Sequence, residues 1–191
     1  MKKVIITLSM SIFFVALAFC SSAIAVSSDS GISLSRSNEG RTVAIGKDLF
    51  TFKHTFENTL KDVSIIEITH PPHQGLAFLL KKHTFDVAGN FYVISGEFEF
   101  FGIQSNDSIQ VRAGDFVHVQ PGIVHSYRHI GAELGKVLVV TASTGFQDFL
   151  EEVGTWVADP TIAPSPTRRP DIVDIEKIVS IAKKHGIKFF N

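Results

Sequence analysis

Several features that would support common functions are scarce in this sequence. Its 191 residues include one cysteine, Cys20, which excludes an internal disulfide and a zinc site built from several cysteines. The 18 Lys and Arg residues are balanced by 19 Asp and Glu residues, so the chain lacks the positive charge that binding to a phosphate backbone requires. Hydrophobic residues make up 45% and charged residues 19%, which is typical of a globular chain that can bury a core. The composition therefore predicts one packed domain that binds no nucleic acid.

The N-terminus has the pattern of a secretory signal peptide. Two lysines precede an apolar run over residues 4–19, and residues 23–25 read Ala-Ile-Ala, the small-residue pattern at which signal peptidases cut. The run is shorter than the roughly 20 residues of a membrane span, so an uncleaved anchor is the weaker alternative. A lipoprotein attached through Cys20 is also a weaker alternative, because the bulky residue before it does not suit that signal. We expect residues 1–25 to be removed before Val26, leaving a secreted or periplasmic protein with no membrane segment.

Short apolar runs dominate the middle of the chain. Residues 26–40 are rich in Ser and Gly and predict a flexible N-terminal arm. Over residues 41–144, runs rich in Val, Ile and Phe are separated by Gly, Asn, Asp or Pro, which is typical of the strands of an antiparallel sandwich or barrel. The alternation Glu-Phe-Glu-Phe at residues 97–100 puts carboxylates on one face of a strand and aromatic rings on the other.

The hydrophobic period changes in residues 145–191. Phe146, Phe149, Leu150 and Val153 fall at helical spacing and predict an amphipathic helix that ends near Gly154. A proline-rich strap follows, and it is expected to be extended. A second helix is predicted from Asp171 to Gly186, with an apolar stripe made of Ile172, Ile175, Ile178, Val179 and Ala182. The fold class is therefore all-β, followed by a helical C-terminal extension with two α-helices.

Residues 114–129 carry a recognisable motif. A glycine-aspartate turn leads into a strand, a proline-glycine turn follows, and His125 begins the next strand. This stretch resembles the second motif of the cupin superfamily, and residues 91–100 look like the end of the first. The tail is similar to that of bacterial single-domain cupins labelled quercetin 2,3-dioxygenase-like. The resemblance implies a cupin-type β-sandwich or barrel (jelly roll) over residues 41–144, in which His125 points into the mouth of the barrel.

The resemblance also implies a divalent metal ion, which would be iron, nickel, copper, manganese or zinc. Its ligands would be two histidines spaced His-X-His, a glutamate shortly after, and the histidine of the second motif. Only His125 stands at its family position, because the glutamate position, counted back from Gly96, falls on Gly89. His83 and Asp86, in the loop before the next strand, are the candidates that would complete a metal site with His125, and the alternative is a pair of solvated loop residues.

Other histidines are weaker candidates for metal binding. His70 and His73 flank two prolines, so they are predicted to be turn residues. His118 lies in the apolar stretch Phe-Val-His-Val and is predicted to be a hydrogen-bonded histidine of the core or rim. Lys81 argues against a conventional cation site, because an ammonium aimed into the pocket would repel a metal.

The same barrel could hold a small molecule. Its many phenylalanines suit a packed core and equally a pocket for a flat, apolar ligand. Lys81 near the entrance would attract an anionic ligand. Together with Lys81, the candidate ligand-binding residues are Tyr92, Phe116 and His118.

Two functions are compatible with these residues. The first is a metal-dependent, dioxygenase-like enzyme acting on a small aromatic compound. The second is a catalytically silent cupin that binds a small molecule without a cofactor. No phosphate-binding loop, Gly-X-Ser-X-Gly elbow or His-Glu-X-X-His motif suggests another chemistry. A homodimer is a further possibility, because exposed sheet edges need covering.

Overall fold

The computed structural model describes most of the chain after the predicted N-terminal arm. The described residues are 34–37, 39–54, 63–72, 81–102, 108–159 and 172–190. Apart from Leu34, they belong to one compact unit, Ser35–Asn191. The predicted signal peptide and His73 lie outside the described residues. None of the helices described is long and apolar enough to cross a membrane.

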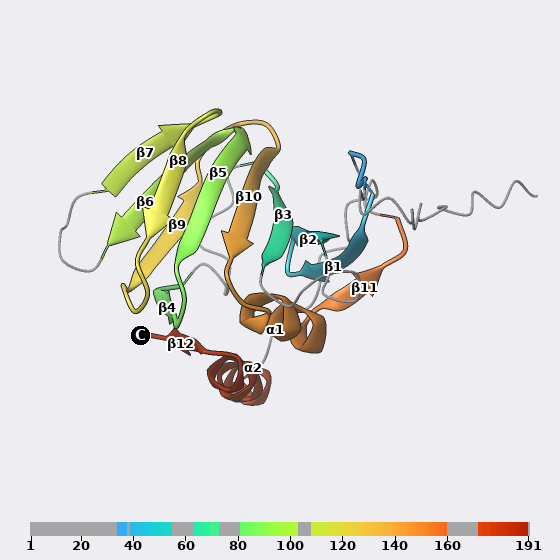
Figure 1. The fold of residues 1–191 in the computed structure, drawn as a ribbon, viewed down its shortest axis with the longest axis vertical. Helices are drawn as coiled ribbons and strands as arrows, with labels where there is room; N and C mark the ends of the chain where they lie inside the picture. The colour runs from blue at the N-terminus through green and yellow to red at the C-terminus, as the bar shows by residue number, and fades with distance from the viewer. Residues whose placement is uncertain are drawn as a thin grey trace, which may run out of the picture. The chain divides into compact units, whose positions relative to one another are not determined.

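The described strands form two antiparallel sheets (Figure 1). The seven-stranded sheet has the order β11 (Thr155–Val157), β1 (Arg41–Ile45), β2 (Asp48–His54), β3 (Ser64–His70), β10 (Gly135–Thr141), β5 (Gly89–Ser95) and β8 (Phe116–Val119). The five-stranded sheet has the order β12 (Ile187–Phe189), β4 (His83–Phe85), β9 (His125–His129), β6 (Glu97–Gly102) and β7 (Ser108–Arg112). With the helices α1 (Gly145–Val153) and α2 (Ile172–Lys184), they confirm the predicted β-sandwich with C-terminal helices.

Alternating burial along the strands builds the core. Every second residue of β3 and of β10 is buried, and the residues between are half-buried. The largest fully buried side chains include Phe50, Phe91, Phe98 and Phe149. Burying each such ring stabilises the fold by about 2 to 3 kcal/mol. The phenylalanines that could have lined an open pocket are therefore largely used to fill the barrel.

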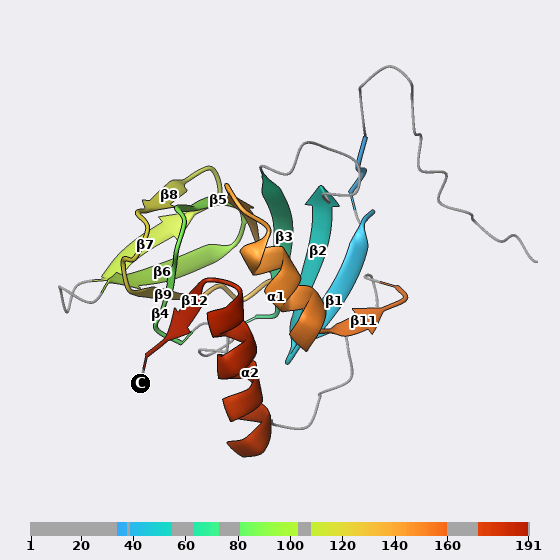
Figure 2. The same cartoon turned by 60° about the horizontal axis from the view of Figure 1, so that its bottom comes forward.

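Both predicted helices are present. In α1, Phe149 and Leu150 are buried, and the helix packs across one end of the strands (Figure 2). In α2, Ala182 is buried as predicted, but Val179 is 39% exposed, so it does not belong to the apolar stripe. The chain leaves α2 through Gly186, whose φ of 77° is favourable only for glycine.

The C-terminal extension also contributes one strand to each sheet. β11 pairs with β1, and β12 pairs with β4, where Phe189 lies opposite His83. These strands have three residues each, which is too short to show a hydrophobic period. As a result, β12 covers the sheet edge beside His83.

Candidate functional site

A pair of histidines faces the inside of the barrel. His83 on β4 and His125 on β9 are opposite each other in the antiparallel register, and their ring centroids are 4.4 Å apart. Their exposed fractions are 5% and 4%. The prediction that His125 begins a strand is confirmed, whereas the placement of His83 in a loop is wrong. The short strand β4 carries His83 into the interior.

Both histidines are oriented by backbone carbonyls. Nδ1 of His83 donates a hydrogen bond to the Lys81 carbonyl oxygen at 2.7 Å, and Nδ1 of His125 donates to the Ile123 carbonyl oxygen at 2.9 Å. Burial, reinforced by the neighbouring His125, lowers the pKa of His83 to about 3, and burial also lowers the pKa of His125. Each ring is therefore neutral, with its proton on Nδ1 and a free electron pair on Nε2.

An apolar cavity adjoins His83. Its volume of about 20 Å³ leaves room for about one water molecule. Its described lining is Phe50, Ile68, His83, Phe85, Phe91, Tyr127, Phe146, Phe149, Ile187 and Phe189. Only His83 and Tyr127 bring polar side-chain atoms to this wall. A larger ligand would have to displace aromatic side chains of α1 or β12.

The residues around the pair do not form the metal site that the resemblance implies. Phe85 lies two residues after His83, at the spacing of a His-X-His pair, and its side chain cannot bind a metal. A Cβ atom at Gly89, the glutamate position, would lie 2.9 Å from the Phe91 ring and 3.3 Å from the Phe85 ring. Those rings occupy the space that further ligands would need. Within the described ranges, no group of three His, Cys, Asp or Glu side chains is arranged to hold a metal ion.

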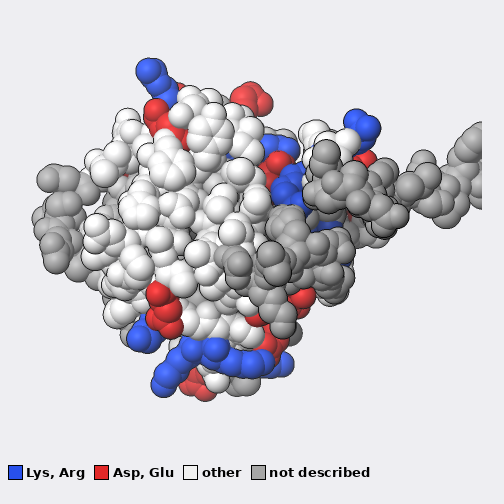
Figure 3. All heavy atoms as spheres, viewed as in Figure 1, with Lys and Arg blue, Asp and Glu red and all other residues white. Residues whose placement is uncertain are grey.

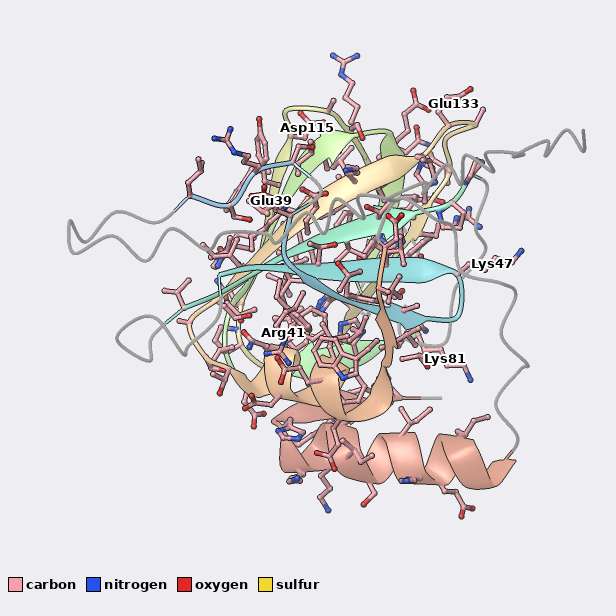
Figure 4. All side chains as sticks on the ribbon, turned by 90° about the vertical axis from the view of Figure 1, so that its right-hand side faces the viewer. Glu39, Arg41, Lys47, Lys81, Asp115 and Glu133 are labelled. Atoms are coloured by element: carbon pink, nitrogen blue, oxygen red, sulfur yellow. The ribbon has the colours of Figure 1, made fainter. Side chains whose placement is uncertain are left out.

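Asp86 and Lys81 do not join the histidines. Asp86 is exposed, and its backbone N–H donates to the Gly186 carbonyl oxygen at 3.0 Å, which places it at the junction of β4 with the C-terminal strand. The Lys81 side chain is exposed and points away from the barrel (Figure 4). The contribution of Lys81 to the site is its carbonyl oxygen. The predictions that Asp86 is a metal ligand and that Lys81 lines the pocket receive no support from this arrangement.

The other three ligand-binding candidates lie on the outer face of the seven-stranded sheet. Tyr92 and Phe116 are opposite each other on β5 and β8 and are 44% and 60% exposed. His118 is also exposed, and its Nδ1 lies 2.8 Å from the Asn90 amide oxygen. They lie outside the barrel interior, because the alternation of β5 turns Phe91 inward and Tyr92 outward. Figure 3 shows a largely uncharged surface over β5, β8 and β10.

A second polar group inside the barrel was not predicted from the sequence. His70 was predicted to be a turn residue, but it is the last residue of β3 and is fully buried. Its Nδ1 lies 2.8 Å from Asp48 Oδ1, and its Nε2 lies 3.1 Å from the Tyr127 hydroxyl oxygen. Burial and the Asp48 carboxylate raise the pKa of Tyr127, so the phenol stays protonated. We call these three residues the Asp48–His70–Tyr127 chain.

His129 lies beside this chain, and glycines surround it. Its Nδ1 donates to the Pro71 carbonyl oxygen at 2.9 Å. A Cβ atom at Gly96, Gly131 or Gly135 would come within 2.9 Å, 2.8 Å or 2.6 Å of the His129 ring. The alternation of side chains along a strand could have predicted part of this polar interior, because His125, Tyr127 and His129 share one face of β9.

Comparison with known proteins agrees with this architecture. The family model described as Cupin domain matches residues 67–141, and this match agrees with the jelly-roll β-sandwich fold described above. No curated protein matches the chain.

Solved structures with this fold have low sequence identity to the chain. The polyketide cyclase RemF from Streptomyces resistomycificus is 12% identical with a TM-score of 0.50, and the match covers 58% of this chain and 79% of RemF. A cupin superfamily protein from Desulfitobacterium hafniense is 13% identical with a TM-score of 0.41, covering 52% of this chain and 81% of that one. Similarity at this level concerns the fold alone.

Proposed function

We propose that this protein is an exported cupin that binds a small, largely apolar molecule in its barrel and has no metal-dependent activity. The cavity that adjoins the neutral His83 supports this proposal, because its other polar lining residue is Tyr127 and the remaining walls are aromatic or aliphatic. Ligand pockets typically combine such walls with a few polar groups that fix the ligand's orientation. Export rests on the N-terminal signal pattern.

The few side chains available as metal ligands argue against a dioxygenase-like enzyme. Catalytic sites for divalent ions use three or more protein ligands, whereas the described residues here offer two imidazoles and the glutamate position is Gly89. Phe85 and Phe91 pack against His125, with ring centroids 5.6 Å and 5.8 Å from it. The residues present do not fit the implied ion, and we derive no step through it.

One observation favours the metal-dependent alternative. Nε2 of His125 is buried and has no hydrogen-bond partner among the described residues. Histidines that bind metals commonly donate their other N–H to a carbonyl oxygen, as His83 and His125 both do. A quercetin dioxygenase-like enzyme acting on an aromatic compound is therefore the second candidate function.

Binding of toluene tests the proposed function, because this probe is apolar and has no hydrogen-bonding group. The cavity has room for about one water molecule, so toluene can enter only by displacing aromatic side chains of α1 or β12. With that displacement we expect saturable binding, measured by ligand-observed NMR on the purified protein. Ile68→Phe, which adds volume to the cavity wall, should abolish binding. Leu138→Phe, on the outward side of the neighbouring strand β10, should leave it unchanged. Circular dichroism confirms that each variant is folded. Equal binding by both variants would show that the cavity is not the site.

A further inference from the structure

The C-terminal helix α2 and strand β12 close one side of the cavity. Ile187 and Phe189 of β12 line the cavity, and Ile187 is 2% exposed. Because β12 pairs with β4, Phe189 lies opposite His83, with ring centroids 6.0 Å apart. In Figure 1, β12 lies beside β4 at the lower end of the barrel, next to α2. We call residues 172–190 the C-terminal cover, since a molecule larger than water reaches the cavity only if part of its wall moves.

The C-terminal cover is held by a short edge strand and little buried side-chain surface. β12 has three residues and lies at the edge of the five-stranded sheet. Beside this pairing, the Phe190 backbone N–H donates to the Lys82 carbonyl oxygen at 2.8 Å, and the Gly186 carbonyl oxygen accepts from the Asp86 N–H at 3.0 Å. Among the described side chains of α2, only Ala182 is fully buried. Segments with few buried contacts open locally at the smallest cost in free energy.

The opposite wall of the cavity, formed by α1, is anchored more deeply. Phe149 and Leu150 are 1% and 0% exposed. The helix also follows directly after β10, which lies between β3 and β5 in the seven-stranded sheet. Moving α1 would therefore disturb the core, whereas moving the C-terminal cover would uncover only one sheet edge.

The closed position of the C-terminal cover is nevertheless well defined. A Cβ atom at Gly145, the first residue of α1, would overlap the His185 carbonyl oxygen, so only glycine allows this close approach. The Glu152 carboxylate accepts from Lys184 Nζ at 2.9 Å and lies 2.8 Å from His185 Nε2. Glu152 and Lys184 are 39% and 64% exposed, and exposed ion pairs of this kind add little stability. These contacts position the cover without making it hard to open.

We propose that the C-terminal cover opens as a unit, while the rest of the barrel stays folded, and thereby admits a ligand to the cavity beside His83. This inference rests on the proposed small-molecule function and names the segment that controls access to its site. When β12 separates from β4, Ile187 and Phe189 leave the cavity wall, and Phe149 of α1 stays in place.

Amide hydrogen exchange tests the opening without a ligand. In the original protein, we expect amides of β12 to exchange about tenfold or more faster than those of the central strand β10. Ala182→Glu puts a carboxylate at a fully buried site, and Val179→Glu puts one at a site that is 39% exposed on the same helix. The first should speed exchange in α2 and β12 by a further factor of about ten or more and leave β10 unchanged. The second should change neither.

A disulfide that locks the C-terminal cover tests its role in ligand entry. Thr84→Cys with Lys188→Cys joins opposite residues of β4 and β12. The control lock, Glu97→Cys with Arg112→Cys, joins opposite residues of β6 and β7. Both carry Cys20→Ser, and counting free thiols confirms that each disulfide has formed. We expect the oxidised cover lock to weaken toluene binding about tenfold or more and reduction to restore it, while the control lock binds equally in both states.

The outcomes separate this inference from the function on which it rests. If β12 exchanges as slowly as β10, if β10 loses protection together with β12 in Ala182→Glu, or if the oxidised cover lock binds toluene as well as the reduced one, the opening cover is wrong and the binding function stands. If toluene binds neither the original protein nor the reduced variants, the proposed function fails, and hydrogen exchange still shows whether the cover opens.

Discussion

The two polar groups inside the barrel differ in how completely they are bonded. In the Asp48–His70–Tyr127 chain, both ring nitrogens of His70 have partners. In the histidine pair, each ring uses Nδ1 for a backbone carbonyl oxygen, and Nε2 of His125 is left without a partner among the described residues. A fully bonded buried network holds a fold together, whereas an unsatisfied atom weakens it. The contrast indicates that the Asp48–His70–Tyr127 chain stabilises the barrel, and it is compatible with the ligand binding proposed beside the histidine pair.

The largest effect is expected from breaking the bonded chain. Asp48→Ala removes the acceptor for His70 Nδ1 and leaves a buried N–H unsatisfied, which should lower the free energy of unfolding by about 3 kcal/mol or more. His125→Asn keeps a donor for the Ile123 carbonyl oxygen and should cost only about 1 kcal/mol. Urea denaturation measures both. Equal losses in the free energy of unfolding would show that the bonded chain and the histidine pair do not differ in how much they stabilise the fold.

The next largest loss of stability is expected from overpacking beside the Asp48–His70–Tyr127 chain. Gly135→Ala would place a Cβ atom 2.6 Å from the His129 ring and 2.7 Å from the Phe98 ring, both buried. This overpacking should lower the free energy of unfolding by about 2 kcal/mol. The control is Gly102→Ala, where a Cβ atom meets nothing within 4 Å. If both variants unfold at the same urea concentration, that end of the barrel is loosely packed.

Acid should destabilise the protein through the histidine pair. The pKa of His83 falls from 6.5 to about 3 on folding, so between these values the unfolded chain binds a proton that the folded chain excludes. The free energy of unfolding therefore decreases as the pH falls below 6.5, by about 1.4 kcal/mol at pH 5.5 from His83 alone. His83→Asn, which keeps a donor for the Lys81 carbonyl oxygen, should flatten this part of the pH profile. An unchanged pH profile would mean that folding does not lower the pKa of His83.

The smallest effect is expected on the outer face. Phe116 is 60% exposed, so Phe116→Lys should change the free energy of unfolding of the monomer by less than about 0.5 kcal/mol. The measurement is urea denaturation at two protein concentrations. A larger loss that depends on concentration would show that this face is covered by a second copy, as in the predicted homodimer.

The sequence predicted the positions of turns and strands better than it predicted which side chains lie next to one another. The turns at Gly114 and Gly122 and the start of β9 at His125 were predictable, because glycine and proline mark them. The face of β5 that Tyr92 occupies could not be predicted, because residues 91–94 are all apolar or aromatic and a period of two gives no direction there. His83 was predicted to come close to His125, as it does, but its place on a strand was missed because β4 has only three residues.

The Asp48–His70–Tyr127 chain illustrates a second limit. Asp48 is the first residue of β2, and His70 is the last residue of β3. These two strands are paired, with Leu49 opposite Thr69. Tyr127 reaches them from the other sheet. Such contacts depend on strand register and sheet packing, which local patterns do not encode.

The metal content of the purified protein tests the central claim most directly. The protein is incubated separately with iron, nickel, copper, manganese and zinc salts, desalted, and assayed for bound metal alongside His125→Asn. Because the described site offers two neutral imidazoles and no carboxylate, we predict far less than one ion per chain, with no difference between the two proteins. One tightly bound ion per chain that disappears in His125→Asn would contradict the proposed metal-free function and favour the metal-dependent enzyme.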